Sequence, residues 1–509
     1  DRGGRTELEF WVATDSGPTK LVVDNERPVC FISAERLEQA TEALAPLGSH
    51  VEVTPLALNS FNGESMAAVY TPNVADHYTA QDILGSRGID VLEGDIRLHD
   101  RYLMERFIHG GMAFAGRLTQ TGNFREVRDC RIRASTYRCA LKLLSLDIEC
   151  DVDGALWSVG LAGDGLDPGE VLVIGPPEPC GHTRILWLPD ETALLVRLRD
   201  RINTLDPDLI IGWNLVNFDL RILLRRAEHC GVPLGIGRGG APATWRDARG
   251  DTGKGFISIP GRVAIDGIDA LRSATWQFAS FSLESVSQEL LGRGKKVDQD
   301  VDDRLSEIRH NFLHDKPALA AYNLEDCVLV LDIFSATNIV DYLVLRSQIT
   351  GLELDRAGGS VAAFTNLYLP RLHRGGYVAP NLPPDGGLAS PGGYVMDSQP
   401  GLYRNVLVLD FKSLYPAIIR TFKIDPMGLV EGLADPDNAI EGFREARFHR
   451  QRHFLPDIIT SLWKQRDQAK RDNDQPRSQA IKILMNSFYG VLGSSGCRFF
   501  DPRLASSIT

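Results

Sequence analysis

The stretch LLSLDIEC, residues 143–150, places two acidic residues inside an apolar strand pattern. Asp147 and Glu149 are separated by one residue, so a strand would project both carboxylates from one face, about 7 Å apart. Two crowded carboxylates on an apolar strand repel each other unless cations lie between them. Taken alone, the triplet DIE is equally typical of an ordinary strand end. The stretch therefore predicts a strand whose acidic face needs partners from elsewhere in the chain.

The length of 509 residues is too great for one hydrophobic core and favours about three domains. The composition, 43% apolar and 24% charged, is that of an ordinary globular protein. No apolar stretch approaches the roughly 18 residues that span a bilayer, and no signal-peptide pattern is present. The eight cysteines show no CxxC spacing, which predicts reduced thiols in a cytosolic protein without a zinc site.

The net charge of −12 is unevenly distributed. Between Arg444 and Arg503 there are 12 Lys/Arg and 6 Asp/Glu, a local balance of +6 that leaves −18 on the remainder. A basic segment on an acidic body fits a protein that holds phosphates locally and metal ions elsewhere. A solvated helical surface is the alternative interpretation of the same segment.

Strand and helix patterns divide the chain into regions. The stretch 7–23 (ELEFWVATDSGPTKLVV) predicts a hairpin around a Ser-Gly-Pro turn in a β-rich first region of about 140 residues. From Leu141 to Thr350, strand patterns (141–150 and 209–213) mix with helical ones (218–230 and 318–334), as expected of an α/β domain.

The last third of the chain has a different pattern. The Pro/Gly-rich stretch 381–395 predicts a linker, and Val406–Leu409 predicts a strand that ends at Asp410. Asp410 would then be a charge at the end of a buried strand, which is costly unless the charge is paired or holds a metal. Two helices are expected on either side of 472–476, with Pro476 at the start of the second.

Further acids could join Asp147 and Glu149. Asp219 follows an apolar strand and a turn that contains Asn214, and Tyr322 and Asp326 lie at i and i+4 on one helical face. Singly, Asp219 could be a helix-capping acid and Asp326 part of an exposed helix surface. Together the four carboxylates and the tyrosine are the set that a two-metal site for phosphodiester hydrolysis requires.

At this point the sequence resembles the proofreading 3′→5′ exonucleases of the DEDDy type. Their three motifs match in order as DIE, NLVNFD (214–219) and YNLED (322–326). The resemblance implies two Mg²⁺ or Mn²⁺ ions held by Asp147, Glu149, Asp219 and Asp326. It implies that Tyr322 orients the attacking water and that Asn214 contacts DNA.

The resemblance extends to the family B DNA polymerases over essentially the whole chain. DFKSLYPAII (410–419) is similar to their first polymerase motif, and KILMNSFYG (482–490) to their second. By this resemblance Asp410 binds metal ions, again Mg²⁺ or Mn²⁺, and Tyr415 excludes a ribose 2′-hydroxyl. The other expected nucleotide-binding residues are Phe411, Arg466, Lys470, Lys482 and Asn486, and the expected DNA-binding residues are Tyr489, Gly490, Gly392 and Gly393.

The sequence departs from the family pattern in several places. Ala417 and Phe411 replace a common serine and tyrosine, and the YxGG motif reads SPGG (390–393), without its aromatic residue. No DTD motif occurs, and the family's thumb is missing. The nuclease set is thus complete and the polymerase set half present, which predicts a chain that trims 3′ ends without extending a primer.

The resemblance implies a multidomain α/β and α+β fold: a β-containing N-terminal domain, a ribonuclease-H-like exonuclease domain, and a partial palm with helical-hairpin fingers. The expected segments are 1–140 (N-terminal domain), 141–355 (exonuclease), 356–390 (return segment and linker), 391–440 (partial palm), 441–495 (fingers) and 496–509 (second palm segment). The implied partners are primer-template DNA, single-stranded 3′ ends, deoxynucleoside triphosphates and a sliding clamp, with no membrane, in a bacterial cytoplasm. The alternatives are a free-standing exonuclease, which has no use for the polymerase motifs, and a non-catalytic DNA-binding relative, which would have lost its carboxylates.

Overall fold

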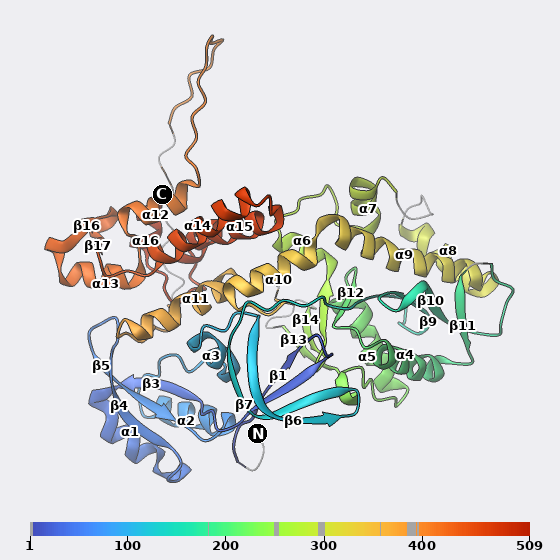
Figure 1. Ribbon diagram of the computed structural model, residues 1–509, viewed down its shortest axis with the longest axis horizontal. Helices are drawn as coiled ribbons and strands as arrows, with labels where there is room; N and C mark the ends of the chain where they lie inside the picture. The colour runs from blue at the N-terminus through green and yellow to red at the C-terminus, as the bar shows by residue number, and fades with distance from the viewer. Residues whose placement is uncertain are drawn as a thin grey trace.

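The computed structural model is elongated, with a blue and cyan β-rich part, a green α/β part and an orange to red helical part joined by a run of yellow helices (Figure 1). It describes residues 4–181, 183–248, 254–293, 301–356, 358–383, 393 and 396–509, and only the backbone of 301–307. The mixed α/β multidomain fold is the one that the sequence predicts.

The N-terminal part contains two sheets. The predicted hairpin is confirmed: β1 (Leu8–Val12) and β2 (Thr19–Val23) pair antiparallel. They join β6 (Met112–Thr121) and β7 (Phe124–Ala134) in the order β1-β2-β7-β6. The second sheet, β3-β5-β4, contains β3 (Val29–Ser33), β4 (Glu52–Asn59) and β5 (Ser65–Tyr70). Two helices belong to the same region as this sheet, α1 (Leu37–Leu44) and α2 (Val74–Ser86). A third helix, α3 (Leu98–Glu105), comes after them in the chain.

The middle part is built on a six-stranded sheet of order β11-β10-β9-β8-β12-β15. Its strands are β8 (Leu143–Cys150), β9 (Leu156–Gly163), β10 (Leu166–Ile174), β11 (Arg184–Leu188), β12 (Leu209–Gly212) and β15 (Val263–Asp266). β8 runs parallel to β12 and antiparallel to β9. The sheet and its helices α4 (Glu191–Leu205), α5 (Arg221–His229), α6 (Gly267–Ser273) and α7 (Leu283–Leu291) confirm the predicted α/β domain.

The register of β8 and β9 decides which side chains face the long helix α9 (Lys316–Thr337), which packs across both strands. Asp147 lies opposite Gly160, and Glu149 opposite Ser158. A Cβ atom on Gly160 would lie 2.9 Å from both the Asn323 carbonyl oxygen and the Cys327 sulfur. The absence of a side chain at Gly160 therefore lets α9 lie close to the acidic face of β8.

A run of helices connects the middle and last parts of the chain (Figure 1). It comprises α8 (Val301–His314), α9, α10 (Ile339–Thr350) and α11 (Ser360–Arg374). The last part adds α12 (Leu414–Phe422), α13 (Pro426–Ala434), the short strands β16 (Ala439–Glu441) and β17 (Arg447–His449), and α16 (Pro502–Ile508).

The two helices predicted around 472–476 are confirmed as α14 (Leu455–Arg471) and α15 (Gln475–Leu492), which pack on each other. Pro476 lies in the first turn of α15, and the Asp474 side chain accepts the backbone N–H of Arg477 at 3.1 Å. This is an N-terminal cap, which satisfies a donor that the helix itself leaves without a partner. α15 also packs on α10 and α11, so the hairpin rests on the connecting helices.

The strand predicted at Val406–Leu409 is wrong. This stretch has no regular secondary structure, its four side chains are exposed by 65–91%, and it belongs to the orange segment that projects from the molecule in Figure 1. No strand among the described residues pairs with it, and a strand forms only where a partner takes its backbone hydrogen bonds. Asp410 is consequently exposed instead of buried. Most of the predicted linker at 381–395 lies outside the described residues.

All eight cysteines are free thiols, as predicted. Within the described residues, no single helix is long and apolar enough to cross a membrane. The pair α9 and α10, bent by 56°, is long and apolar enough only when the two helices are taken together.

A buried ionic network joins the N-terminal part to α11. Glu93, which is fully buried, accepts hydrogen bonds from Arg101 at 3.0 Å, from His373 at 2.9 Å and from the backbone N–H of Ala379 at 2.7 Å. The other ring nitrogen of His373 lies 2.6 Å from Glu105. Burial opposes both charges, but the partners outweigh it, holding the pKa of Glu93 at about 2 and raising that of His373 to about 9.

The sign of the His373 shift predicts how stability depends on pH. A histidine whose pKa is raised from 6.5 to about 9 on folding contributes its full stabilisation below pH 6.5 and loses it as the pH rises through 9. Thermal unfolding midpoints measured from pH 6.5 to 9.5 should therefore fall more steeply for the wild type than for His373→Gln. Parallel slopes for the two proteins would contradict the assignment.

Candidate active site

The acidic face of β8 meets α9, and the two elements bring three of the predicted acids together. Asp147 and Glu149 from β8 and Asp326 from α9 each offer a carboxylate oxygen within 4.8 Å of the others. Asp147 and Glu149 are half-buried and Asp326 is buried. Hard oxygen donors in this number suit Mg²⁺ or Mn²⁺ and not the softer metals that prefer sulfur or imidazole.

Asp219, the fourth predicted acid, contacts β8 at Ile148, between Asp147 and Glu149. It belongs to a π-helical turn, η3 (Val216–Leu220), that runs into α5, and irregular turns of this kind are frequent at functional sites. Its side chain is 1% exposed and accepts the backbone N–H of Ile148 at 3.0 Å. Burial, and then the charge of Asp147, raise the pKa of Asp219 well above its ordinary value.

Two thiols lie beside these acids. Burial, and then the charges of Asp147 and Asp326, raise the pKa of the Cys327 thiol well above its ordinary value. Burial, and then the charge of Glu149, raise the pKa of the Cys150 thiol to about 12. The three converging carboxylates are hard oxygen donors, and this donor set fits divalent metal ions.

Tyr322 and Asn214 are the two other residues that the sequence predicts for this site. Tyr322 is half-buried on α9, one turn before Asp326. Asn214 is exposed in the turn after β12, and its φ of 61° is a left-handed conformation that asparagine adopts more readily than most residues. Its carbonyl accepts the backbone N–H of Phe218, whose ring is 42% exposed.

Sequence reasoning missed Asn323, which lies inside the quoted stretch 322–326. Its amide nitrogen donates to Asp147 at 2.7 Å, and its amide oxygen accepts from Ser158 at 3.1 Å. Asn323 and Asp326 are three residues apart on one helix, so their common face could have been recognised from the sequence. The role of Ser158 could not, because it depends on the pairing of β8 with β9.

One of the expected nucleotide-binding residues, Arg466, contacts the start of α12. Arg466 on α14 donates to the Ser413 hydroxyl at 3.0 Å, and Lys412 pairs with Asp467 at 3.0 Å. The rings of Tyr415 and Tyr489 lie 4.4 Å apart between centroids. The structure thus brings α12 and both helices of the hairpin together, and it leaves exposed Asp410, Phe411, Lys470, Lys482, Asn486 and Gly490.

Asp410 is not part of an acidic group in the described residues. Of the expected DNA-binding glycines, Gly392 lies outside the described residues, and a Cβ on Gly393 would lie 3.1 Å from the Thr509 carbonyl oxygen.

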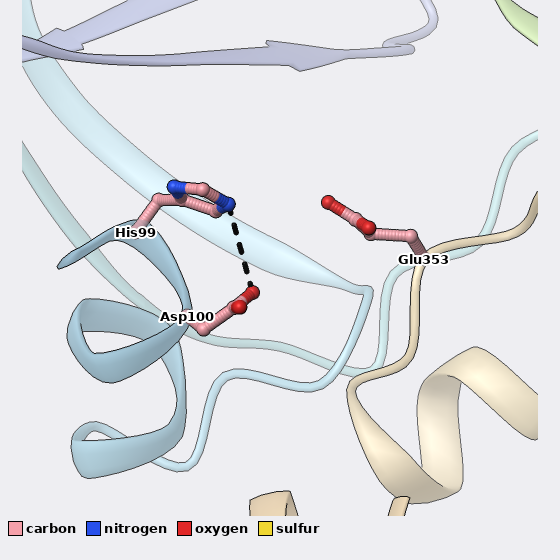
Figure 2. Close-up of side chains that lie close together, drawn as sticks. All are labelled: His99, Asp100 and Glu353. Atoms are coloured by element: carbon pink, nitrogen blue, oxygen red, sulfur yellow. Dashed lines mark ion pairs between the residues drawn. The ribbon is translucent and has the colours of Figure 1, made fainter. Parts of the chain in front are cut away.

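A second group with metal-binding potential consists of His99 and Asp100 on α3 and Glu353 after α10 (Figure 2). His99 lies 3.7 Å from Asp100. Arg97 lies 2.8 Å from Asp100 and 3.6 Å from Glu353, so a cation already accompanies both carboxylates. We assign no metal to this group, which is an ion-pair cluster between α3 and the segment after α10.

Two protein-family models match parts of the chain. Residues 357–509 match the model of DNA polymerase family B, and residues 174–286 match the exonuclease domain of the same family. The chain contains domains of DNA polymerase family B. Of the four predicted acids, only Asp219 lies inside the matched exonuclease range.

Two relatives and one solved structure show how similar the chain is to known proteins. The chain is 47% identical to DNA polymerase II of Escherichia coli, over 99% of its own length and 64% of that protein. It is 28% identical to a DNA polymerase of Pyrococcus glycovorans, over 72% of its own length and 49% of the relative. The fold is that of the family B DNA polymerase from Pyrobaculum calidifontis, with a TM-score of 0.78 at 22% identity, covering 100% of this chain and 69% of that one.

The close approach at Gly160 can be tested by substitution. Gly160→Ala should press α9 away from β8, because the new methyl group would meet Asn323 and Cys327 at 2.9 Å. Overpacking of this kind lowers the free energy of unfolding by about 1–3 kcal/mol, measurable by chemical denaturation. Gly85→Ala is the matched control, since its methyl group would meet nothing within 4 Å. Equal stability of the two variants would contradict the packing.

Proposed function

We propose that the chain is part of a DNA-directed DNA polymerase and that Asp147, Glu149, Asp219 and Asp326 form its 3′→5′ proofreading exonuclease site. The observation that carries the proposal is the convergence of three carboxylates within 4.8 Å, with Asp219 hydrogen-bonded to the Ile148 backbone between two of them. Convergence distinguishes a catalytic set from a strand end, a helix cap and an exposed helix face, which were the separate interpretations of these acids.

The proposed reaction is hydrolysis of the last phosphodiester bond of a single-stranded 3′ end. Two Mg²⁺ or Mn²⁺ ions, when bound, would activate water and stabilise the attacking and leaving oxygens. Asp147, Glu149, Asp219 and Asp326 would hold the ions. Tyr322, one turn from Asp326, would orient the water through its hydroxyl, and Asn214 and the exposed ring of Phe218 would contact the DNA.

The proposed polymerase site lies at the start of α12. Asp410 would bind metal ions, with Phe411 beside it, and Arg466, Lys470, Lys482 and Asn486 would bind the triphosphate of a deoxynucleotide. This proposal is supported by the packing of α12 against both α14 and α15, which brings Arg466 within 3.0 Å of Ser413. Tyr489, Gly490, Gly392 and Gly393 would contact primer-template DNA. The Tyr415 ring, beside Tyr489, would exclude the 2′-hydroxyl of a ribonucleotide.

The matched curated relatives are longer than this chain, which spans 64% and 49% of the two described above. Activity, substrates and partners of the whole protein are accordingly inferred from the family. We infer a bacterial, cytoplasmic enzyme that uses deoxynucleoside triphosphates and primer-template DNA and interacts with a sliding clamp.

The nuclease proposal predicts the effect of removing the β8 acids. Asp147→Ala combined with Glu149→Ala should abolish metal-dependent shortening of a 3′-terminated single strand, because two of the three converging carboxylates are lost. The assay follows a 5′-labelled oligonucleotide in Mg²⁺ or Mn²⁺. Asp153→Ala, which removes an exposed acid just after β8, should degrade the strand at the wild-type rate. Undiminished degradation by the double variant would reject the site.

The sugar-selection proposal predicts the effect of removing the Tyr415 ring. In a protein that contains this sequence and extends primers, Tyr415→Ala should raise the ratio of ribonucleotide to deoxynucleotide incorporation about 10- to 100-fold. This range corresponds to relief of a steric clash of roughly 1.4–2.8 kcal/mol. Tyr415→Phe keeps the ring and should leave the ratio unchanged. An unchanged ratio in Tyr415→Ala would make Tyr415 a packing residue only.

A further inference from the structure

Asn323 is a buried polar residue beside the proposed nuclease site. Its side chain is fully buried between α9 and the β8–β9 pair. A buried amide is costly unless its donor and its acceptor both find partners. In Asn323 they do: the nitrogen donates to Asp147 at 2.7 Å and the oxygen accepts from the Ser158 hydroxyl at 3.1 Å.

The orientation of this amide follows from chemistry. An ionised carboxylate only accepts hydrogen bonds, so the amide nitrogen of Asn323, and not its oxygen, must face Asp147. The Ser158 hydroxyl, also fully buried, donates to the amide oxygen and holds the amide in this orientation. The result is a chain of two hydrogen bonds, from Ser158 on β9 to Asn323 on α9 and from Asn323 to Asp147 on β8.

Two of the acids therefore each accept a hydrogen bond from a donor that the fold holds in place. Asn323 holds Asp147, and the backbone N–H of Ile148 holds Asp219. Hydrogen bonds to a carboxylate favour its charged form and restrict its rotation. Residues that hydrogen-bond a metal-binding carboxylate in this way contribute strongly to the affinity of the metal.

We propose that Asn323 is a positioning residue for divalent cations in the nuclease site, with Ser158 as its anchor. The inference rests on the proposed nuclease function, since it assumes that Asp147 is a metal ligand. Asn323 would act through its hydrogen bond to Asp147, holding that carboxylate in the orientation that binds the ion.

The primary test is Mn²⁺ affinity, measured on the 509-residue chain by electron paramagnetic resonance of the free ion. Asn323→Leu removes the donor at similar volume and should weaken Mn²⁺ binding about 10- to 100-fold. Ser158→Ala keeps the amide beside Asp147 but frees its rotation, and should weaken binding by a smaller factor. Asn203→Leu is the matched control: it loses a hydrogen bond to Gly235 at 2.8 Å in the same domain but contacts none of the nuclease acids, and should bind Mn²⁺ normally.

A merely structural role gives different results. In that case Asn323→Leu and Asn203→Leu would lower the thermal midpoint alike, and neither would change Mn²⁺ affinity. Positioning predicts in addition that higher Mn²⁺ concentrations restore degradation of a single strand by Asn323→Leu. If Asn323→Leu does not fold, Ser158→Ala decides: wild-type Mn²⁺ affinity in that variant overturns the inference.

The wild type separates this inference from the function on which it rests. If the wild type binds Mn²⁺ and degrades DNA while both variants bind Mn²⁺ equally well, the positioning role is wrong and the nuclease site stands. If the wild type shows no binding and no degradation, the proposed nuclease function is wrong.

Discussion

Repulsion among four carboxylates is the constraint on which the middle of this protein depends. Asp147, Glu149 and Asp326 converge where β8 meets α9, Asp219 on η3 contacts β8 at Ile148, and burial makes the charge of Asp219 costlier. Hydrogen-bond donors offset part of this cost: the Ile148 backbone N–H contacts Asp219, and the Asn323 amide contacts Asp147. The convergence also needs α9 close to the sheet, which the missing side chain at Gly160 allows.

The connecting helices place the two proposed sites on one support. α9 carries Tyr322 and Asp326 and continues through α10 into α11. α15, which carries Lys482 and Tyr489, packs on both α10 and α11, and its residue Ala480 belongs to the same apolar cluster as α10. Packed interiors deform little, so the spacing between the nuclease acids and the base of the helical hairpin is set by side-chain packing along this run.

The sequence predicted the local elements and the acids but not the contacts between elements. The alternation around Asp147, the helical spacing of Tyr322 and Asp326 and the turn before Pro476 are local signals, and each element formed as expected. The roles of Ser158 and Gly160 depend on the register of β9 against β8, which no local pattern reveals. The strand predicted at Val406–Leu409 failed for the same reason, because an apolar run becomes a strand only beside a partner.

Asp147 and Asp410 show how much environment decides the use of the same side chain. Asp147 sits in a group of acids whose orientation is fixed by hydrogen bonds from within residues 141–355. Asp410 is exposed at the end of an unpaired apolar run, and the described residues place no acidic group around it. Metal ions require several ligands at defined positions, so a single exposed carboxylate cannot fix their geometry. The proposed nuclease site is therefore organised by contacts between β8, β9 and α9, whereas the described residues supply no comparable contacts to Asp410.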